Sequence, residues 1–240
     1  MIRAVVFDFG QTLVDSAEGF RTAEKEIQQK AVAALGLDDW EGFLDSYRGI
    51  RSAFHARSEF SRRAILEGVF RHCGRVPDPA LLEVWEAGYW EKIHTMTSLF
   101  PETEEILQAL QGRGYRLALI TNAQGQMVEG KHRIGRYPRL ASFFEAIVVA
   151  GEGGIPAKPD PTPFRICLEK MGIKPDEAVY VGDDWRIDVL GSGAVGMHPV
   201  WLRHRSVRRN WPAVETGRVP VIDSLERLLD IEGLIQGGKK

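Results

Sequence analysis

Polar side chains that could carry chemistry stand just beyond short apolar runs at four places in this chain. Carboxylates follow the first and last of these runs, a hydroxyl and an amide follow the second, and a lysine lies beyond the third. In chain order these residues are Asp8, Thr121, Asn122, Lys158, Asp183, Asp184 and Asp188. Clustered carboxylates repel one another unless a cation neutralises them, and an all-oxygen set of ligands suits Mg²⁺.

A magnesium ion held by acids beside a lysine matches the charge that spreads over phosphoryl oxygens during transfer. An aspartate in such a site can act as a nucleophile, which splits one hydrolysis into two displacements. The residue types therefore predict phosphoryl chemistry with Mg²⁺ as cofactor, provided that the fold brings them together.

The elements that must position these residues are visible as β-rich apolar runs that alternate with amphipathic, helix-length stretches. The runs are Ala4–Phe7, Leu117–Ile120, Ala146–Val149 and Ala178–Val181, with a weaker fifth at Pro199–Leu202. The helical stretches between the later runs are Glu102–Gln111, Gln126–Ile134, Pro161–Met171 and Asp188–Ala194. This alternation predicts an α/β fold, a Rossmann-like, doubly wound parallel sheet. Ligands of such sheets bind beyond the carboxyl ends of the strands, where the polar residues stand.

The segment from Asp15 to Ser98 breaks this alternation, because it shows helical patterns and no convincing strand. The expected helices are Glu18–Leu35, Trp40–Phe54, Ser61–Cys73 and Pro79–Ile93. We therefore expect a core domain of residues 1–14 and 98–240, with residues 15–97 inserted as a helical cap domain.

Composition narrows the function classes. The 240 residues carry a net charge of −2, which gives no general attraction to nucleic acid or to an anionic membrane. The longest apolar stretches are far shorter than the ~20 residues that span a bilayer, and the N-terminus does not resemble a signal peptide. We expect a cytoplasmic protein with two reduced cysteines, and oligomeric state has no signal in the sequence. The one basic cluster is interpreted as a solvated loop and comprises Arg203, His204, Arg205, Arg208 and Arg209.

In their order along the chain, Asp8, Thr121, Lys158 and the run from Asp183 to Asp188 resemble the four motifs of the haloacid dehalogenase-like (HAD) superfamily. The helical insertion after the first motif is similar to the type-one cap of that family. The resemblance implies a magnesium-dependent phosphohydrolase that acts on a small phosphorylated metabolite through an aspartyl-phosphate intermediate.

The resemblance also implies a role for each residue. Asp8 would be the nucleophile and a Mg²⁺ ligand, Thr121 would hydrogen-bond the phosphoryl group, and Lys158 would neutralise both. Asp183 would bind Mg²⁺, with Asp184 or Asp188 completing the metal shell. Asn122 and Gln11 are expected to contact the substrate.

Gly10 departs from the family pattern, in which phosphatases usually carry a second aspartate as general acid and base. Its backbone carbonyl can still bind Mg²⁺, but general acid–base help worth typically about 10²–10⁴-fold is missing. Two alternatives stay open. One is a 2-haloacid dehalogenase-type hydrolase, whose aspartate attacks carbon, and the other is a catalytically impaired binding protein.

Overall fold

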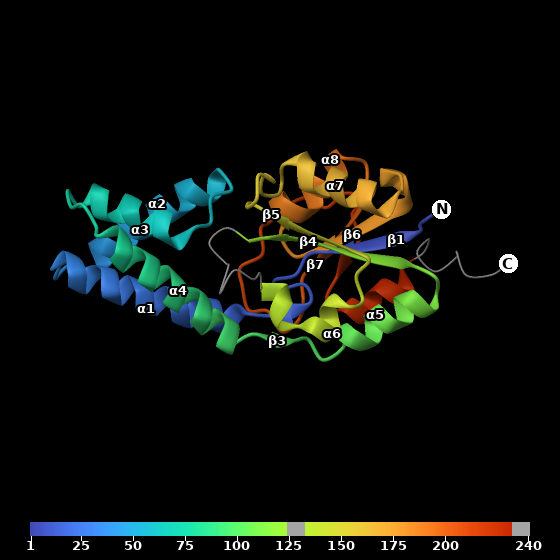
Figure 1. Cartoon of the computed structure of the whole chain (residues 1–240), viewed down its shortest axis with the longest axis horizontal. Helices are drawn as coiled ribbons and strands as arrows, with labels where there is room; N and C mark the ends of the chain where they lie inside the picture. Colours follow the sequence, from blue (N-terminus) through green and yellow to red (C-terminus); the bar gives the residue numbers. More distant parts are fainter. Residues whose placement is uncertain (124–132, 232–240) are drawn as a thin grey trace. The chain divides into compact units, whose positions relative to one another are not determined.

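The computed structural model describes residues 1–123 and 133–231 and contains a six-stranded, wholly parallel sheet (Figure 1). Its strand order is β5-β4-β1-β6-β7-β8. The strands are β1 (Ala4–Phe7), β4 (Arg116–Asn122), β5 (Ala146–Ala150), β6 (Ala178–Gly182), β7 (His198–Leu202) and β8 (Val221–Ile222). The predicted fold class is confirmed. The two-residue strand β8 was not predicted, because so short a strand leaves no periodic pattern.

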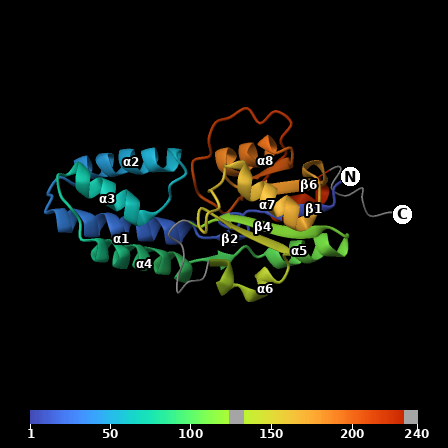
Figure 2. The ribbon, with the colours of Figure 1, turned by 45° about the horizontal axis from the view of Figure 1, so that its top comes forward.

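Helices cover both faces of this sheet (Figures 1 and 2). One face is covered by α5 (Thr103–Gly112), α6 (Pro138–Ala141) and the 3-10 turn η4 (Leu225–Asp230). The other face is covered by α7 (Pro161–Met171) and α8 (Leu190–Ala194). Successive strand residues point to opposite faces, so β1 serves two cores. Phe7 packs in the core that contains α5, and Val6 packs in the core that contains α7.

The predicted helices match with two differences in the described residues. The stretch expected from Asp188 to Ala194 is divided into a π-helical turn, η3 (Trp185–Val189), and the short α8. The four-residue α6 was missed because it is about one turn long. Most of the helix expected at Gln126–Ile134 lies outside the described residues, and a 3-10 turn, η1 (Arg133–Arg136), follows.

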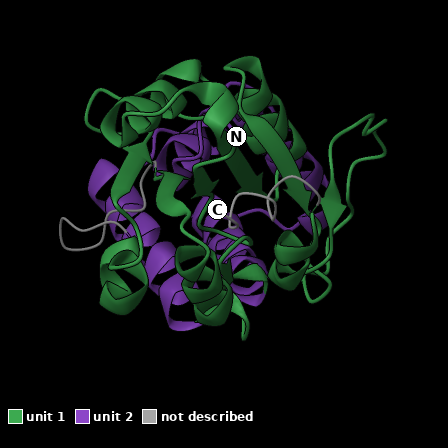
Figure 3. Cartoon of the chain, turned by 90° about the vertical axis from the view of Figure 1, so that its right-hand side faces the viewer, with its two compact units in different colours: residues 1–17, 98–123, 134–240 green, residues 18–97, 124–133 purple. Residues whose placement is uncertain are grey.

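Contacts between residues divide the chain into two compact units, shown in two colours in Figure 3. The first comprises residues 1–17, 98–123 and 134–240, and the second comprises residues 18–97 and 124–133. In the first unit β2 (Val14–Asp15) pairs antiparallel with β3 (Ser98–Leu99), Val14 opposite Leu99. The expectation of no strand between Asp15 and Ser98 is therefore wrong at the two ends of that segment. A pairing of two-residue strands joins positions distant in sequence, which local patterns do not reveal.

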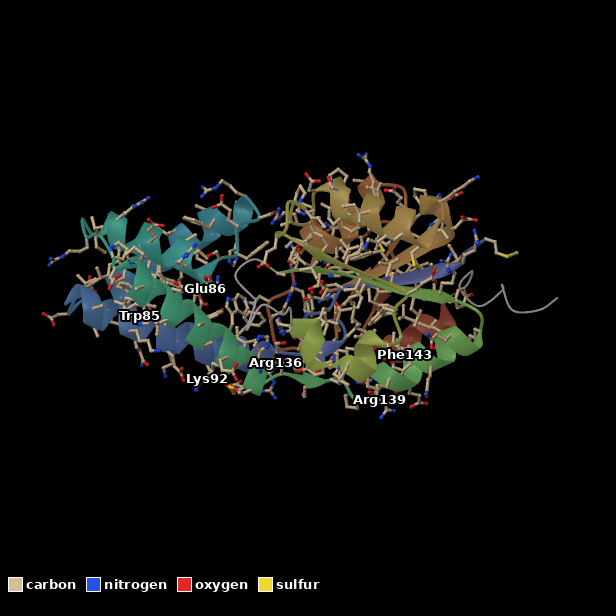
Figure 4. All side chains as sticks on the ribbon, viewed as in Figure 1. Trp85, Glu86, Lys92, Arg136, Arg139 and Phe143 are labelled. Carbon is tan, nitrogen blue, oxygen red and sulfur yellow. The ribbon has the colours of Figure 1, made fainter. Side chains whose placement is uncertain are left out.

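Four helices make up most of the segment between these two strands: α1 (Ala17–Leu35), α2 (Trp40–Ala56), α3 (Arg62–His72) and α4 (Pro79–Thr95). Side chains at their starts accept hydrogen bonds from backbone N–H groups, as at Ser61, whose hydroxyl caps α3. Glu86 on α4, labelled in Figure 4, accepts hydrogen bonds from the Ser61 hydroxyl at 2.9 Å and from the Arg63 N–H at 3.0 Å. This contact fixes the start of α3 to the middle of α4. None of the helices in the described ranges combines the length and the hydropathy of a bilayer-spanning segment.

Candidate active site

The carboxyl ends of β1, β4 and β6 meet at one edge of the sheet because these neighbouring strands run parallel. Phe7 at the end of β1 is in register with Leu119 of β4 and Val181 of β6. The Asp8 N–H donates to the Val181 carbonyl at 2.9 Å, which fixes the first residue after β1 against β6. The polar residues that follow these strands are thereby gathered at one place, as the sequence predicts.

Lys158 lies at the centre of this group, with a side chain only 1% exposed. Its Nζ donates to Asp8 Oδ1 and to Asp188 Oδ1, both at 2.7 Å. It also lies 2.8 Å from the Tyr180 hydroxyl and 3.1 Å from the Ile120 carbonyl. Burial opposes the charge, but attraction by Asp188 and Asp8 outweighs it, so the pKa of Lys158 is raised. The site therefore contains a fixed ammonium group that is charged at neutral pH.

The backbone of Lys158 is held by Asn122 at the end of β4. The Asn122 Oδ1 accepts from the Lys158 N–H at 2.9 Å, and its Nδ2 donates to the Lys158 carbonyl at 3.2 Å. On the other side, Asp160 caps α7 by accepting from the Thr162 N–H at 2.8 Å. Both ends of the Asn122 amide thus position the lysine, and substrate binding by Asn122 stays a prediction.

Three buried carboxylates converge on the same place. Asp8, Asp183 and Asp188 each offer an oxygen, and these oxygens lie within 4.8 Å of one another. Burial raises the pKa of Asp188 to about 6, although Lys158 opposes the shift. Burial also raises the pKa of Asp183, against the pull of Arg209 and with added repulsion from Asp188 and Asp8. Both pKa values are raised because burial, with repulsion among the acids added, disfavours the charged carboxylates more than the nearby cations favour them. This all-oxygen donor set fits Mg²⁺.

The structure separates the two acids between which the sequence left a choice. The Asp188 Oδ2 accepts from the Asp184 N–H at 3.0 Å, while its Oδ1 contacts Lys158. Asp184 instead turns its carboxylate to the Ile187 N–H at 2.9 Å, where it caps the π-helical turn. Asp188 can approach this closely because residue 182 is a glycine; a Cβ there would overlap the Asp188 side chain. Asp188 is thus the acid that joins Asp8 and Asp183.

The turn after Asp8 contains the position that departs from the family pattern. Gly10 forms a bridge with Val14, and the residue of this turn with a left-handed backbone is Gln11, at φ 60°. The Gln11 Oε1 is buried and has no hydrogen-bond partner among the described residues, so it is available to a donor. Thr121 is buried at the end of β4, with its hydroxyl 3.5 Å from the Asn122 carbonyl. The substrate contacts expected of Gln11 and Thr121 stay predictions.

Three further residues touch the site and were not predicted to belong to it. Tyr180 in β6 places its hydroxyl against Lys158 and, at 3.2 Å, against Asp188. Trp201 donates its indole N–H to the Asp183 carbonyl at 2.9 Å. Arg209 pairs with the Asp183 carboxylate, Nη1 to Oδ2, at 2.5 Å.

The solvated-loop interpretation of the basic cluster is incomplete for Arg209, because this exposed loop residue also pairs with the buried Asp183 carboxylate. It is wrong for His204, which is buried and whose Nε2 lies 2.8 Å from Glu102 Oε1. Tyr180 could have been found, since a hydroxyl in a strand buried on both faces needs a polar partner. Arg209 had no such signal, because it follows the last long strand in a segment without regular structure.

Comparison with known proteins identifies the family to which this chain belongs. The family model of haloacid dehalogenase-like hydrolases matches residues 2–196. The chain therefore belongs to the haloacid dehalogenase-like hydrolases and is a hydrolase.

The relatives with similar sequences carry phosphatase names. The chain is 28% identical over 236 residues to the glyceraldehyde 3-phosphate phosphatase of Methanopyrus kandleri, covering 96% of this chain and 97% of that protein. It is 30% identical over 183 residues to the phosphoglycolate phosphatase of Aquifex aeolicus, covering 76% of each. Among solved structures, a HAD phosphatase from Thermococcus onnurineus matches with a TM-score of 0.65 at 23% identity, over 97% of this chain and 98% of that one. A 2-haloacid dehalogenase from Pseudomonas syringae matches with a TM-score of 0.63 at 26% identity, over 96% and 97%.

Proposed function

We propose that this protein is a magnesium-dependent phosphatase that hydrolyses a small phosphorylated metabolite through an aspartyl-phosphate on Asp8. The observation that carries the proposal is the buried contact of Asp8 with Lys158 inside a cluster of three carboxylates. An acid poised beside a fixed cation is suited to attack an anionic phosphoryl group, because the cation offsets the repulsion. The phosphatase names of the relatives support the same reaction.

Each residue has a role in this reaction. Asp8 and Asp183 would bind Mg²⁺ together with the Gly10 carbonyl. Asp188 would orient Lys158 and support the metal shell. Asp184 would hold the turn between Asp183 and Asp188. When bound, Mg²⁺ supplies positive charge to the phosphoryl oxygens. Lys158 would share in that stabilisation, and Thr121 would donate a hydrogen bond to the phosphoryl group.

The reaction has two displacements at phosphorus. An Asp8 carboxylate oxygen attacks, the bond from phosphorus to the ester oxygen breaks, and the leaving oxygen takes a proton from water. A water molecule then attacks the same phosphorus, loses its proton to solvent, and breaks the bond to Asp8. Inorganic phosphate leaves and the carboxylate is restored. Asn122 would assist both displacements by holding Lys158 in place. Gln11 would accept a hydrogen bond from the substrate through its Oε1, which has no partner among the described residues.

A dehalogenase is the main alternative, and the fold does not exclude it, since solved structures of both kinds resemble this chain. Attack at the carbon of a haloacid develops no phosphoryl charge. Three clustered acids would then be costly without benefit, because burial and repulsion from Asp8 raise the pKa values of both Asp183 and Asp188. The acid cluster therefore favours the phosphatase.

A substrate screen tests the proposal. Sugar phosphates, acyl phosphates, nucleotides and p-nitrophenyl phosphate would be supplied to the protein with Mg²⁺ or with a chelator, and haloacids in parallel with a halide electrode. We expect phosphate release that depends on Mg²⁺ and no halide release. Halide release without phosphate release would contradict the proposal.

Gly10 makes a separate prediction about the leaving group. Without a general acid at this position, the ester oxygen leaves with more negative charge, so the rate should rise steeply as the leaving-group pKa falls. Gly10→Asp should raise turnover of alkyl phosphates by about 10²-fold or more, the lower end of what general acid catalysis contributes. Gly10 is not among the glycines with a left-handed backbone, so an aspartate at this position does not have to adopt that conformation.

Rates for a series of aryl and alkyl phosphates would be measured with both proteins. Gly49→Asp is the matched control, because Gly49 lies in α2 and has nothing near its Cβ position. Gly74→Asp is not suitable, because Gly74 has a left-handed backbone. A flat dependence of the wild-type rate on leaving-group pKa would show that another group already supplies the proton.

The same proposal includes the domain roles and the location expected from the sequence. Residues 15–97 would act as the cap that selects the substrate, and residues 1–14 and 98–240 as the catalytic core. The location would be the cytoplasm, where small phosphorylated metabolites are found.

A further inference from the structure

Arg209 contacts one of the acids of the proposed metal site, where a second positive charge is not expected. Its guanidinium lies against Asp183 through two contacts, 2.5 Å from Nη1 to the carboxylate Oδ2 and 3.2 Å from Nη2 to the carbonyl. Asp183 is one of the three acids whose oxygens converge. An arginine side chain is always charged and binds carboxylates strongly. A positive charge that belongs to the protein itself therefore already contacts an acid that Mg²⁺ would need.

The two cations of the site differ in how firmly they are held. The Lys158 side chain is 1% exposed and has lost its contact with water, whereas the Arg209 side chain is 31% exposed. Arg209 belongs to the segment 203–220 between β7 and β8, which contains no helix or strand. Its guanidinium can thus return to water at small cost, while the ammonium of Lys158 cannot.

A tryptophan is joined to this arginine. The guanidinium lies over the Trp211 ring, 4.2 Å from its centroid, and Trp211 meets Trp201 edge to face at 6.0 Å. Withdrawal of Arg209 from Asp183 would change the surroundings of the Trp211 indole. Tryptophan emission can therefore report the movement without any substrate.

We propose that Arg209 is a resident cation that competes with Mg²⁺ for Asp183, so that metal binding requires Arg209 to withdraw from this carboxylate. The inference rests on the magnesium site of the proposed function. Two cations on one buried carboxylate repel each other, so each lowers the affinity of the other. The segment 203–220 thereby sets the Mg²⁺ concentration at which the enzyme becomes active.

Calorimetric titration of Mg²⁺ into substrate-free protein tests the competition. Arg209→Gln should bind Mg²⁺ at least about tenfold more tightly than the wild type, because one nearby positive charge is removed. Arg208→Gln is the matched control, since it removes the same charge from the exposed neighbouring residue, and it should change the affinity by less than about twofold at moderate salt.

Equal affinities of Arg209→Gln and Arg208→Gln would overturn the inference, and weaker binding by Arg209→Gln would show instead that Arg209 helps Asp183 to bind metal. If neither the wild type nor the variants bind Mg²⁺, the magnesium site of the proposed function fails as well. The two failures are therefore distinguishable.

Fluorescence of the otherwise unchanged protein gives a second test. Mg²⁺ should alter the tryptophan emission of the wild type, and Trp211→Phe should remove most of that change. A change of the same size in Arg209→Gln would overturn the inference, because withdrawal of Arg209 would then not be its cause.

Discussion

Asp8→Asn is expected to lower phosphatase activity by about 10⁴-fold or more on every substrate, the size of loss seen when an enzyme loses its nucleophile. An amide has almost the same shape as the carboxylate but does not attack phosphorus. The loss should be the same for activated and unactivated esters, because the bond to Asp8 forms in the first step for both. Steady-state rates with p-nitrophenyl phosphate and with an alkyl phosphate would measure it.

The fold of this variant should survive. The substitution removes one of three mutually repelling acids, so the loss of the ionic contact with Lys158 is partly offset. Asp176→Asn is the matched control, because Asp176 is exposed and lies before β6 at the end opposite the site. It should keep full activity. An Asp8→Asn protein that melts like the wild type and still turns over would exclude Asp8 as the nucleophile.

Lys158→Met should cost both activity and stability. The free energy of unfolding should fall by about 3 kcal/mol, because Asp8 and Asp188 lose the cation buried between them. Activity should fall by about 10²–10³-fold, the loss caused by removing one group that stabilises transition-state charge. Urea denaturation of the metal-free protein and steady-state kinetics would measure the two effects.

Lys170→Met provides the comparison for this variant. Lys170 is exposed near the end of α7, so its loss should leave activity unchanged and move the stability by only a few tenths of a kcal/mol. If Lys158→Met is as stable as Lys170→Met, then the buried lysine is not required to neutralise the acids.

The core sheet was predictable because its strands are buried on both faces. Runs such as Ala4–Phe7 and Ala178–Gly182 are almost wholly apolar, and each is followed by polar residues at the same edge of the sheet. A parallel sheet then brings those residues together whatever the details of packing. This is why Asp8, Lys158, Asp183 and Asp188 could be named in advance.

The parts that sequence reasoning missed depend on long-range contacts without a local pattern. The pair β2 and β3 joins Val14 to Leu99, and two-residue strands have no periodicity. Arg209 meets Asp183 only because the segment after β7 returns toward the site. A π-helical turn decides which of Asp184 and Asp188 joins the other acids. Such a turn differs from an α-helix in its hydrogen bonds and not in its residue types, so the sequence did not reveal it.

Trapping of the covalent intermediate tests the central claim most directly. The protein would be mixed with p-nitrophenyl phosphate and Mg²⁺, quenched in acid during the first turnovers, digested, and examined by mass spectrometry. A phosphoryl group should appear on the peptide that contains Asp8. It should accumulate because Gly10 supplies no base to activate the water of the second step, and it should be absent from Asp8→Asn. Rapid phosphate release with no phosphoryl group on Asp8 at any time would contradict the account.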